Sequence, residues 1–166
     1  MTETTAAFHP HDHGACIADG LSRAEDVARR KGLRFTPVRR RTLEILLQRH
    51  GAMGAYDVLD RLREDGFSAQ PPVAYRALDF LVEHGFAHRI RRLNAFAACT
   101  HPGEDHSAAF LICRGCDAVA ELAADPLRAA LEQGARTVGF SVERANIEAL
   151  GLCPVCQSTQ APEGIA

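Results

Sequence analysis

The chain has 166 residues, of which 46% are hydrophobic and 24% are charged, a composition typical of a globular soluble protein. Its N-terminus lacks an apolar run behind a basic start, and nowhere do about 18 apolar residues follow one another, so the sequence predicts neither a secretory signal nor a membrane span. We therefore expect a cytoplasmic protein without a membrane partner, whose six cysteines bind metal rather than form disulfides.

The net charge of -2 conceals an uneven distribution along the chain. Residues 21–95 contain 15 Lys and Arg against 9 Asp and Glu, whereas residues 96–166 contain 4 against 9. A basic first half joined to an acidic second half favours a domain that binds a polyanion, followed by a regulatory or assembly domain. An ordinary scatter of surface charge is the alternative.

Residues 1–20 read as a flexible tail. His9, His11, His13 and Cys16 within it resemble a metal-binding tract, although most tails of this composition are simply disordered.

Four helices are predicted after the tail. The first starts at Ser22, which opens an S-x-x-E capping box. The second starts at Thr36, a good N-cap that is followed by Pro37 at the first helical position. Apolar residues at helical spacing predict a third helix from Ala55 and a fourth that follows Gln70.

Two short strands, residues 86–92 and 95–99, follow the fourth helix. Helices followed by a β-hairpin are the order of a winged helix-turn-helix domain, which we place at residues 21–99. Tyr75 and Arg76 fall on the polar side of the fourth helix, where they either contact DNA or are solvated surface residues.

The pattern changes beyond His101 to a mixed α/β domain, predicted at residues 100–157 and followed by a second flexible tail at residues 158–166. The fold class is therefore α+β. Strands are predicted at residues 108–113 and 118–122, and a last strand that runs from Phe140 through Ile147 to Gly151. A helix starting at Asp125 is expected to bury an inner face of four residues, Leu127, Ala130, Leu131 and Ala135. So thin a sheet leaves a face uncovered, which predicts a homodimer.

Two C-x-x-C pairs lie in this second domain: Cys113 with Cys116, and Cys153 with Cys156. Each pair directs two thiolates towards one point, and together the four sulfurs suffice to close a tetrahedral zinc site. Two disulfides or a redox-active pair are the alternatives. The absence of a secretory signal disfavours disulfides, and a redox-active pair would not need two copies of the motif.

Four further residues of ligand type lie around the connection between the domains: His88, Cys99, His106 and Glu121. Their spacing forms no local motif, so only folding could bring them together. One thiolate, two imidazoles and a carboxylate suit zinc. Ligands drawn from both domains suit a metal sensor. Separate structural roles for each residue are the alternative.

The chain resembles the ferric uptake regulator family, most closely its zinc-sensing members, between about Ser22 and Cys156. The motifs that carry the resemblance are Arg34-Phe35-Thr36-Pro37-Val38-Arg39, Ala55-Tyr56-Asp57-Val58-Leu59, Pro71-Pro72-Val73-Ala74-Tyr75-Arg76-Ala77-Leu78, residues 106–116 and residues 147–153. A Tyr-Arg-x-Leu helix followed by two C-x-x-C knuckles is specific to this family.

The resemblance implies a homodimeric, zinc-responsive transcriptional repressor that binds promoter DNA and shuts off zinc uptake genes. Each chain would carry one structural and one regulatory zinc ion. By the same resemblance, the two C-x-x-C pairs hold the structural zinc, and His88, Cys99, His106 and Glu121 hold the regulatory one. Tyr75 and Arg76 would read DNA bases, Tyr56 would lie near the groove, and Asp60 and Arg63 could bridge two dimers on one operator.

Two departures from the family pattern affect the details. Iron-sensing members carry a run of histidines before the first knuckle, where this chain has His101-Pro102-Gly103-Glu104-Asp105-His106, and this loss favours zinc over iron. Val73 stands where the recognition helix usually opens with Ser or Thr, so one phosphate or capping contact is missing.

Three other functions are considered. The chain could be a family member that senses iron or manganese, or a zinc-ribbon module that binds protein and not DNA. A zinc hydrolase needs an open coordination position, whereas four protein ligands fill the proposed site and no H-E-x-x-H helix is present. We therefore expect no enzymatic activity.

Overall fold

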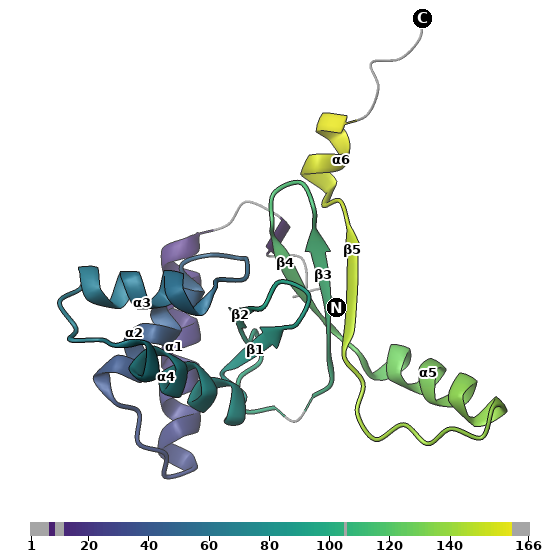
Figure 1. Cartoon of the computed structure of the whole chain (residues 1–166), viewed down its shortest axis with the longest axis horizontal. Coiled ribbons are helices and arrows are strands. Elements are labelled where there is room, and N and C mark those ends of the chain that lie inside the picture. Colours follow the sequence, from purple (N-terminus) through teal and green to yellow (C-terminus); the bar gives the residue numbers. More distant parts are fainter. Residues whose placement is uncertain (1–6, 9–11, 105, 161–166) are drawn as a thin grey trace, which may run out of the picture. The chain divides into compact units, whose positions relative to one another are not determined.

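The computed structural model describes residues 7–8, 12–104 and 106–160 and divides the chain into two compact units (Figure 1). The helical unit comprises residues 12–104. The sheet unit comprises residues 106–160 together with residues 7–8. Within the described residues, no helix combines the length and apolar character needed to cross a membrane.

The helical unit contains four helices and a hairpin: α1 (His13–Arg30), α2 (Pro37–Leu47), α3 (Ala55–Glu64), α4 (Pro71–Glu83), β1 (Ala87–Ile90) and β2 (Ala95–Ala98). The Thr36 side chain caps α2 by accepting from the Arg39 N–H, with Pro37 at the first helical position, as predicted. The fully buried side chains of Leu46, Leu59 and Leu78 come from three different helices and form one core with the rest of the apolar faces.

The hairpin pairs β1 with β2 in antiparallel register, from Ala87 opposite Ala98 to Ile90 opposite Ala95. Strand β1 ends at Ile90, before its predicted end, because a turn that ends at Asn94, with φ of 46°, follows it. Strand β2 starts at Ala95 as predicted and ends at Ala98. Met53 forms an isolated bridge to Phe96 and joins the hairpin to the helices. Helices α2 to α4 followed by this wing confirm the winged helix-turn-helix prediction.

Helix α1 starts earlier than predicted. Its N-cap is Asp12, whose side chain accepts from the Ala15 N–H at 3.2 Å, and not Ser22. The prediction of a flexible tail is therefore wrong for residues 13–20, whereas His9 and His11 lie outside the described residues. Ile17 and Leu21 continue the apolar stripe of the helix towards its N-terminus, and burying that stripe extends the helix.

The sheet unit contains three strands and two helices: β3 (Ala108–Cys113), β4 (Val119–Ala123), α5 (Asp125–Thr137), β5 (Ile147–Gly151) and α6 (Pro154–Gln160). The strand order is β4-β3-β5, with β3 antiparallel to β4 and parallel to β5. Strand β3 has its predicted bounds. The last strand starts only at Ile147, so its predicted extension back to Phe140 is wrong. Helix α6 was not predicted, and residues 158–160 lie in it rather than in a tail.

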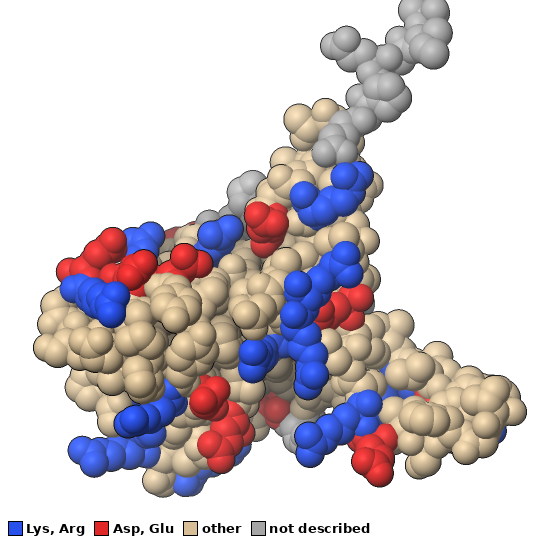
Figure 2. Space-filling view, viewed as in Figure 1, with Lys and Arg blue, Asp and Glu red and all other residues tan. Residues whose placement is uncertain are grey.

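Apolar side chains remain exposed on the sheet unit. Leu127 is 44% exposed, Leu131 47% and Phe140 63%, and of the predicted inner face of α5 only Ala135 is buried. Figure 1 shows α5 standing away from the three strands, and Figure 2 shows mostly uncharged side chains over it. The unit therefore presents an apolar surface that its own chain does not cover.

Candidate metal centres and nucleic-acid interface

The two C-x-x-C pairs meet in the sheet unit at one end of the β3–β5 pair. Parallel pairing places Cys113 opposite Gly151, and the Arg114 N–H donates to the Gly151 carbonyl at 2.9 Å. The first knuckle therefore follows β3 at the same sheet end at which β5 leads into the second. The four sulfur atoms of Cys113, Cys116, Cys153 and Cys156 all lie within 4.8 Å of one another.

The sulfur spacing fits zinc. The Sγ atoms of Cys116 and Cys153 are 3.8 Å apart, and a regular tetrahedron with Zn–S bonds of about 2.3 Å has edges of about 3.8 Å. All six cysteines lie in the described residues and none of them forms a disulfide, so the disulfide alternative has no support. Gly115 allows the close approach, because a Cβ atom there would lie 2.9 Å from the Cys156 sulfur.

The electrostatics of this cluster favour a cation. The Cys113 sulfur accepts backbone N–H groups from Cys153 at 3.3 Å and Gly115 at 3.4 Å, and these bonds lower the pKa of Cys113 to about 6. Contact with the Cys153 side chain, followed by that of Cys113, raises the pKa of Cys156 to about 12. One thiol ionises readily while another resists, so the cluster requires a positive ion to become fully deprotonated.

The second predicted ligand set falls as two pairs, one in each unit. In the sheet unit, Nε2 of His106 lies 2.6 Å from Oε1 of Glu121 on β4. In the helical unit, His88 is on β1, opposite Ala97, and the Cys99 N–H donates to the Phe86 carbonyl at 3.0 Å. His88 and Cys99 therefore project from one face of the wing, with their ligand atoms within 4.8 Å of each other. Each unit carries two adjacent ligands of types that zinc accepts.

The residues expected to contact DNA are exposed on α3 and α4. Tyr75 is 41% exposed and Arg76 is exposed beside it, whereas Ala74 and Leu78 of the same helix are buried. Tyr56 at the start of α3 is also exposed. Figure 2 shows Lys and Arg side chains gathered around the C-terminal end of α1 and its connection to α2. These features provide an exposed helix face and nearby positive charge, the two requirements for groove binding.

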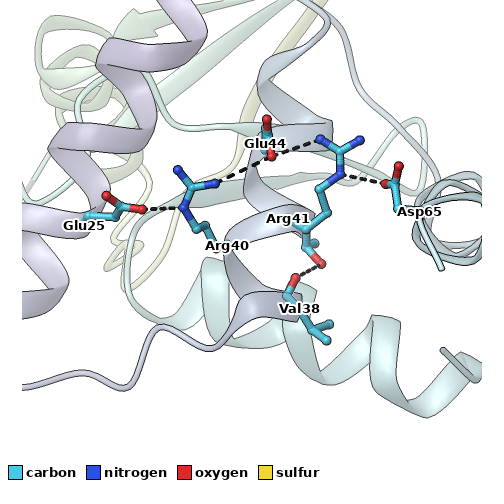
Figure 3. Close-up of polar contacts among 7 residues, drawn as sticks. Glu25, Val38, Arg40, Arg41, Glu44 and Asp65 are labelled. Atoms are coloured by element: carbon cyan, nitrogen blue, oxygen red, sulfur yellow. Dashed lines mark hydrogen bonds and ion pairs between the residues drawn. The ribbon is translucent and has the colours of Figure 1, made fainter. Parts of the chain in front are cut away.

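An ion-pair network holds the helices that support this surface (Figure 3). Arg40 of α2 contacts Glu25 of α1 at 2.6 Å, and Glu44 lies between Arg40 and Arg41, at 3.8 and 2.9 Å. Arg41 contacts Asp65 at 2.7 Å and lowers the pKa of that carboxyl group. Arg40 and Arg41 are thus engaged in joining α1, α2 and the end of α3.

Asp60 and Arg63 form an ion pair along α3, with 3.5 Å between Oδ1 and Nη1. Arg63 also donates from Nε to the Ala69 carbonyl at 3.1 Å, which holds the turn before α4. Both side chains are exposed, so either could exchange this local contact for one with another molecule.

One cluster was missed by the sequence prediction because one of its members lies far along the chain. His50, which follows α2, joins His13 and Cys16 of α1, with ligand atoms that all lie within 4.8 Å. His13 and Cys16 stand out in the sequence as potential ligands, whereas no local pattern marks His50 as a third.

Comparison with known proteins agrees with this fold. The profile of the ferric uptake regulator family matches residues 30–150. The chain is 38% identical over 142 residues to the zinc uptake regulation protein of Escherichia coli (strain K12). The aligned region covers 85% of this chain and 83% of that protein.

Solved structures of similar proteins have the same architecture. A zinc uptake regulator complexed with zinc and DNA has a TM-score of 0.80 and 36% identity, covering 87% of this chain and 97% of that one. Holo XcZur has a TM-score of 0.75 and 37% identity, and the match covers 84% of this chain and 98% of that one. The resemblance stated from sequence motifs and the α+β fold are both confirmed. The chain belongs to the ferric uptake regulator family.

Proposed function

We propose that the chain is a zinc-responsive transcriptional repressor that binds promoter DNA as a zinc-loaded homodimer in the cytoplasm and represses zinc uptake genes. The observation that carries the proposal is the composition of the two ligand sets, one of four thiols and one of a thiol, two imidazoles and a carboxylate. Its similarity to a zinc uptake regulator solved with zinc and DNA supports the same assignment.

The four-thiol site is proposed to hold a structural zinc ion. All its ligands come from the sheet unit, and they join the end of β3 to the start of α6. A closed site with four protein ligands contributes to folding and leaves no position for substrate. This zinc would be present whether or not the protein is bound to DNA.

The regulatory zinc is proposed to bind His88 and Cys99 of the helical unit together with His106 and Glu121 of the sheet unit. An ion bound by both units restricts their relative orientation, and zinc then favours DNA binding only to the extent that it binds the DNA-competent orientation more tightly. By linkage, operator DNA must raise the affinity for this zinc by the same factor. A thiol among the ligands favours zinc over manganese or magnesium.

DNA binding is assigned to the helical unit and dimerisation to the sheet unit. Helix α4 would enter the major groove with Tyr75 and Arg76 towards the bases, and Tyr56 would lie near the groove. The exposed apolar side chains of Leu127, Leu131 and Phe140 support a second copy of the sheet unit as the partner. Closed twofold pairing would place two α4 helices for two half-sites of an operator.

The proposal is tested by following zinc-dependent binding to a fluorescent palindromic AT-rich duplex by anisotropy. Zinc should tighten binding of the wild type by about 1–3 kcal/mol, the usual size of an allosteric coupling. Cys99→Ser should remain dimeric and keep the four-thiol zinc but lose this gain, whereas the matched variant Cys16→Ser should retain it.

Three results would contradict the proposal in different ways. DNA binding that does not depend on zinc would show that the chain is not a zinc sensor. Absence of salt-dependent DNA binding would favour a protein-interaction module. Loss of the zinc response in Cys16→Ser, with Cys99→Ser unaffected, would move the sensor to the N-terminal end of α1.

A further inference from the structure

A third group of metal-ligand side chains lies within the helical unit. His13 and Cys16 are in the first turns of α1, and His50 follows α2. Their ligand atoms all lie within 4.8 Å of one another, and all three residues are half-buried. The His13 and His50 rings stack with centroids 4.7 Å apart and planes 14° apart. These residues are distinct from both ligand sets described above.

The helix packing alone explains why the three residues meet. Helices α1 and α2 run antiparallel, as shown by the contact of Glu25 with Arg40 at one end and the packing of Gly20 on Leu47 at the other. A Cβ atom at position 20 would lie 2.9 Å from the Leu47 side chain, so glycine permits the close approach there. Cys16 lies one helical turn before Gly20, and His50 lies three residues after Leu47, so this approach brings them together.

His13 and Cys16 share one face of α1. Their spacing of three residues places both side chains on the same side of the helix, and Asp12 fixes the first turn through its capping bond to Ala15. The scaffold therefore positions the three ligands through contacts of other residues and does not require an ion to assemble them.

The donor set selects a class of ion. Two imidazole nitrogens and one thiolate are ligands for zinc and similar borderline metals, whereas magnesium and calcium require oxygen ligands. Three protein ligands leave a fourth position for water, unlike a closed structural site. In the described part of the chain, no fourth His, Cys, Asp or Glu residue belongs to this group.

We propose that His13, Cys16 and His50 form an additional zinc site that clips the start of α1 to the end of α2. The site binds zinc more weakly than the four-thiol cluster, because it supplies fewer thiolates and fewer protein ligands. It fills only at higher free zinc and then stabilises the helical unit. The inference does not depend on DNA binding or on the sensor assignment, because every ligand belongs to one unit.

The test is the zinc stoichiometry of the reduced full-length chain, measured by competition with a chromogenic chelator. Cys16→Ser and His50→Gln should each bind one equivalent of zinc fewer than the wild type, and the equivalent lost should be bound more weakly than that of the four-thiol site. His84→Gln, which alters a half-buried histidine of the same unit outside the three clusters, should bind as many as the wild type. Equal stoichiometry in all four proteins would overturn the proposal and leave only a stacked histidine pair.

A second measurement uses the unaltered protein, so that misfolding of a variant cannot obscure the result. The rate of Cys16 alkylation is followed by peptide mass spectrometry at a low zinc level that fills the four-thiol site and at a higher one. Slower alkylation of Cys16 only at the higher level supports the site. An unchanged rate at both levels refutes it, whatever the operator-binding result.

Discussion

Nε2 of His106 lies 2.6 Å from Oε1 of Glu121, whose side chain is only 5% exposed. The pair brings together a loop residue and a strand residue, since His106 precedes β3 and Glu121 lies on β4 opposite Phe110. A buried carboxylate is costly unless a hydrogen-bond donor or a cation accompanies it. The sheet unit therefore holds a carboxylate and an imidazole in direct contact.

Glu121→Gln tests the role of this pair in zinc sensing. Glutamine keeps the size and the ability to contact His106, so the fold should persist, but it removes the negative charge that zinc needs. We expect loss of zinc-dependent operator binding, a change of about 1–3 kcal/mol in coupling free energy. Glu132→Gln is the control, because Glu132 lies in the same unit and pairs with Arg128 and Arg136 along α5. An unchanged zinc midpoint in Glu121→Gln would show that the carboxylate is not a ligand.

Cys116→Ser tests the structural zinc. Cys116 is exposed, so the substitution creates no cavity, and a large loss of stability would have to come from the lost metal bond. Structural zinc in small domains contributes about 10–16 kcal/mol of apparent binding free energy at neutral pH. We expect loss of the tightest zinc and of the soluble dimer, measured by elemental analysis and analytical ultracentrifugation. If Cys116→Ser remained a stable dimer with wild-type zinc content, Cys116 would not be a ligand of a structural zinc ion.

The affinity of the four-thiol site should depend on pH. Zinc binds thiolates, so protons compete with it and affinity should fall as pH falls. Because the pKa of Cys113 is lowered to about 6, this group is already a thiolate above that pH and contributes little to the pH dependence of zinc affinity there. Below about pH 6 it is protonated, and zinc must displace its proton as well. The resistant thiol of Cys156, with a pKa of about 12, must release its proton to zinc throughout the neutral range.

The measurement is zinc affinity by chelator competition between about pH 5.5 and 8, in a Cys16→Ser, Cys99→Ser background that isolates the four-thiol site. The slope against pH should steepen below about 6. The same lowered pKa predicts that metal-free protein gains stability from Cys113 as pH rises from about 6 towards the ordinary thiol value and loses it as pH falls through 6. An affinity that does not change with pH would contradict thiolate ligation.

Arg76→Ala tests base reading by α4. An arginine that contacts guanine through both guanidinium nitrogens discriminates by about 1–3 kcal/mol, so the variant should bind the operator more weakly and with relaxed preference at one position. Arg23→Ala removes an exposed arginine of α1 that pairs with Asp19 and serves as the control. Should Arg76→Ala weaken random and operator DNA equally while reducing the salt slope by about one, Arg76 would be a phosphate contact instead.

Asp60→Asn tests whether neighbouring dimers contact each other on one operator. The ion pair with Arg63 is exposed and contributes only about 0–1 kcal/mol to folding, so the variant should remain stable. If Asp60 and Arg63 reach across dimers, the second dimer should bind a long operator more weakly while the first is unaffected. Glu64→Gln breaks an equivalent pair with Arg61 on the same helix and controls for that effect. Identical isotherms for all three proteins would confine the pair to its local role.

Local patterns in the sequence were sufficient for much of this protein. Three features depend on interactions between near neighbours in the sequence and were predicted where the structure has them. They are the Thr36 cap, the apolar stripe of α4 and the strand over residues 108–113. The two C-x-x-C pairs likewise identify themselves, because each supplies two ligands from one tight turn.

Tertiary packing decided the features whose partners lie far apart in sequence. Helix α1 extends back to His13 because its apolar residues pack against α2. The capping pattern at Ser22 is local and carries no information about this packing. The same packing brings His50 to His13 and Cys16, although His50 lies 34 positions after Cys16 in the sequence. Leu127 and Leu131 have helical periodicity that predicts burial, yet they are exposed in one chain, because periodicity shows which face is apolar and not which molecule covers it.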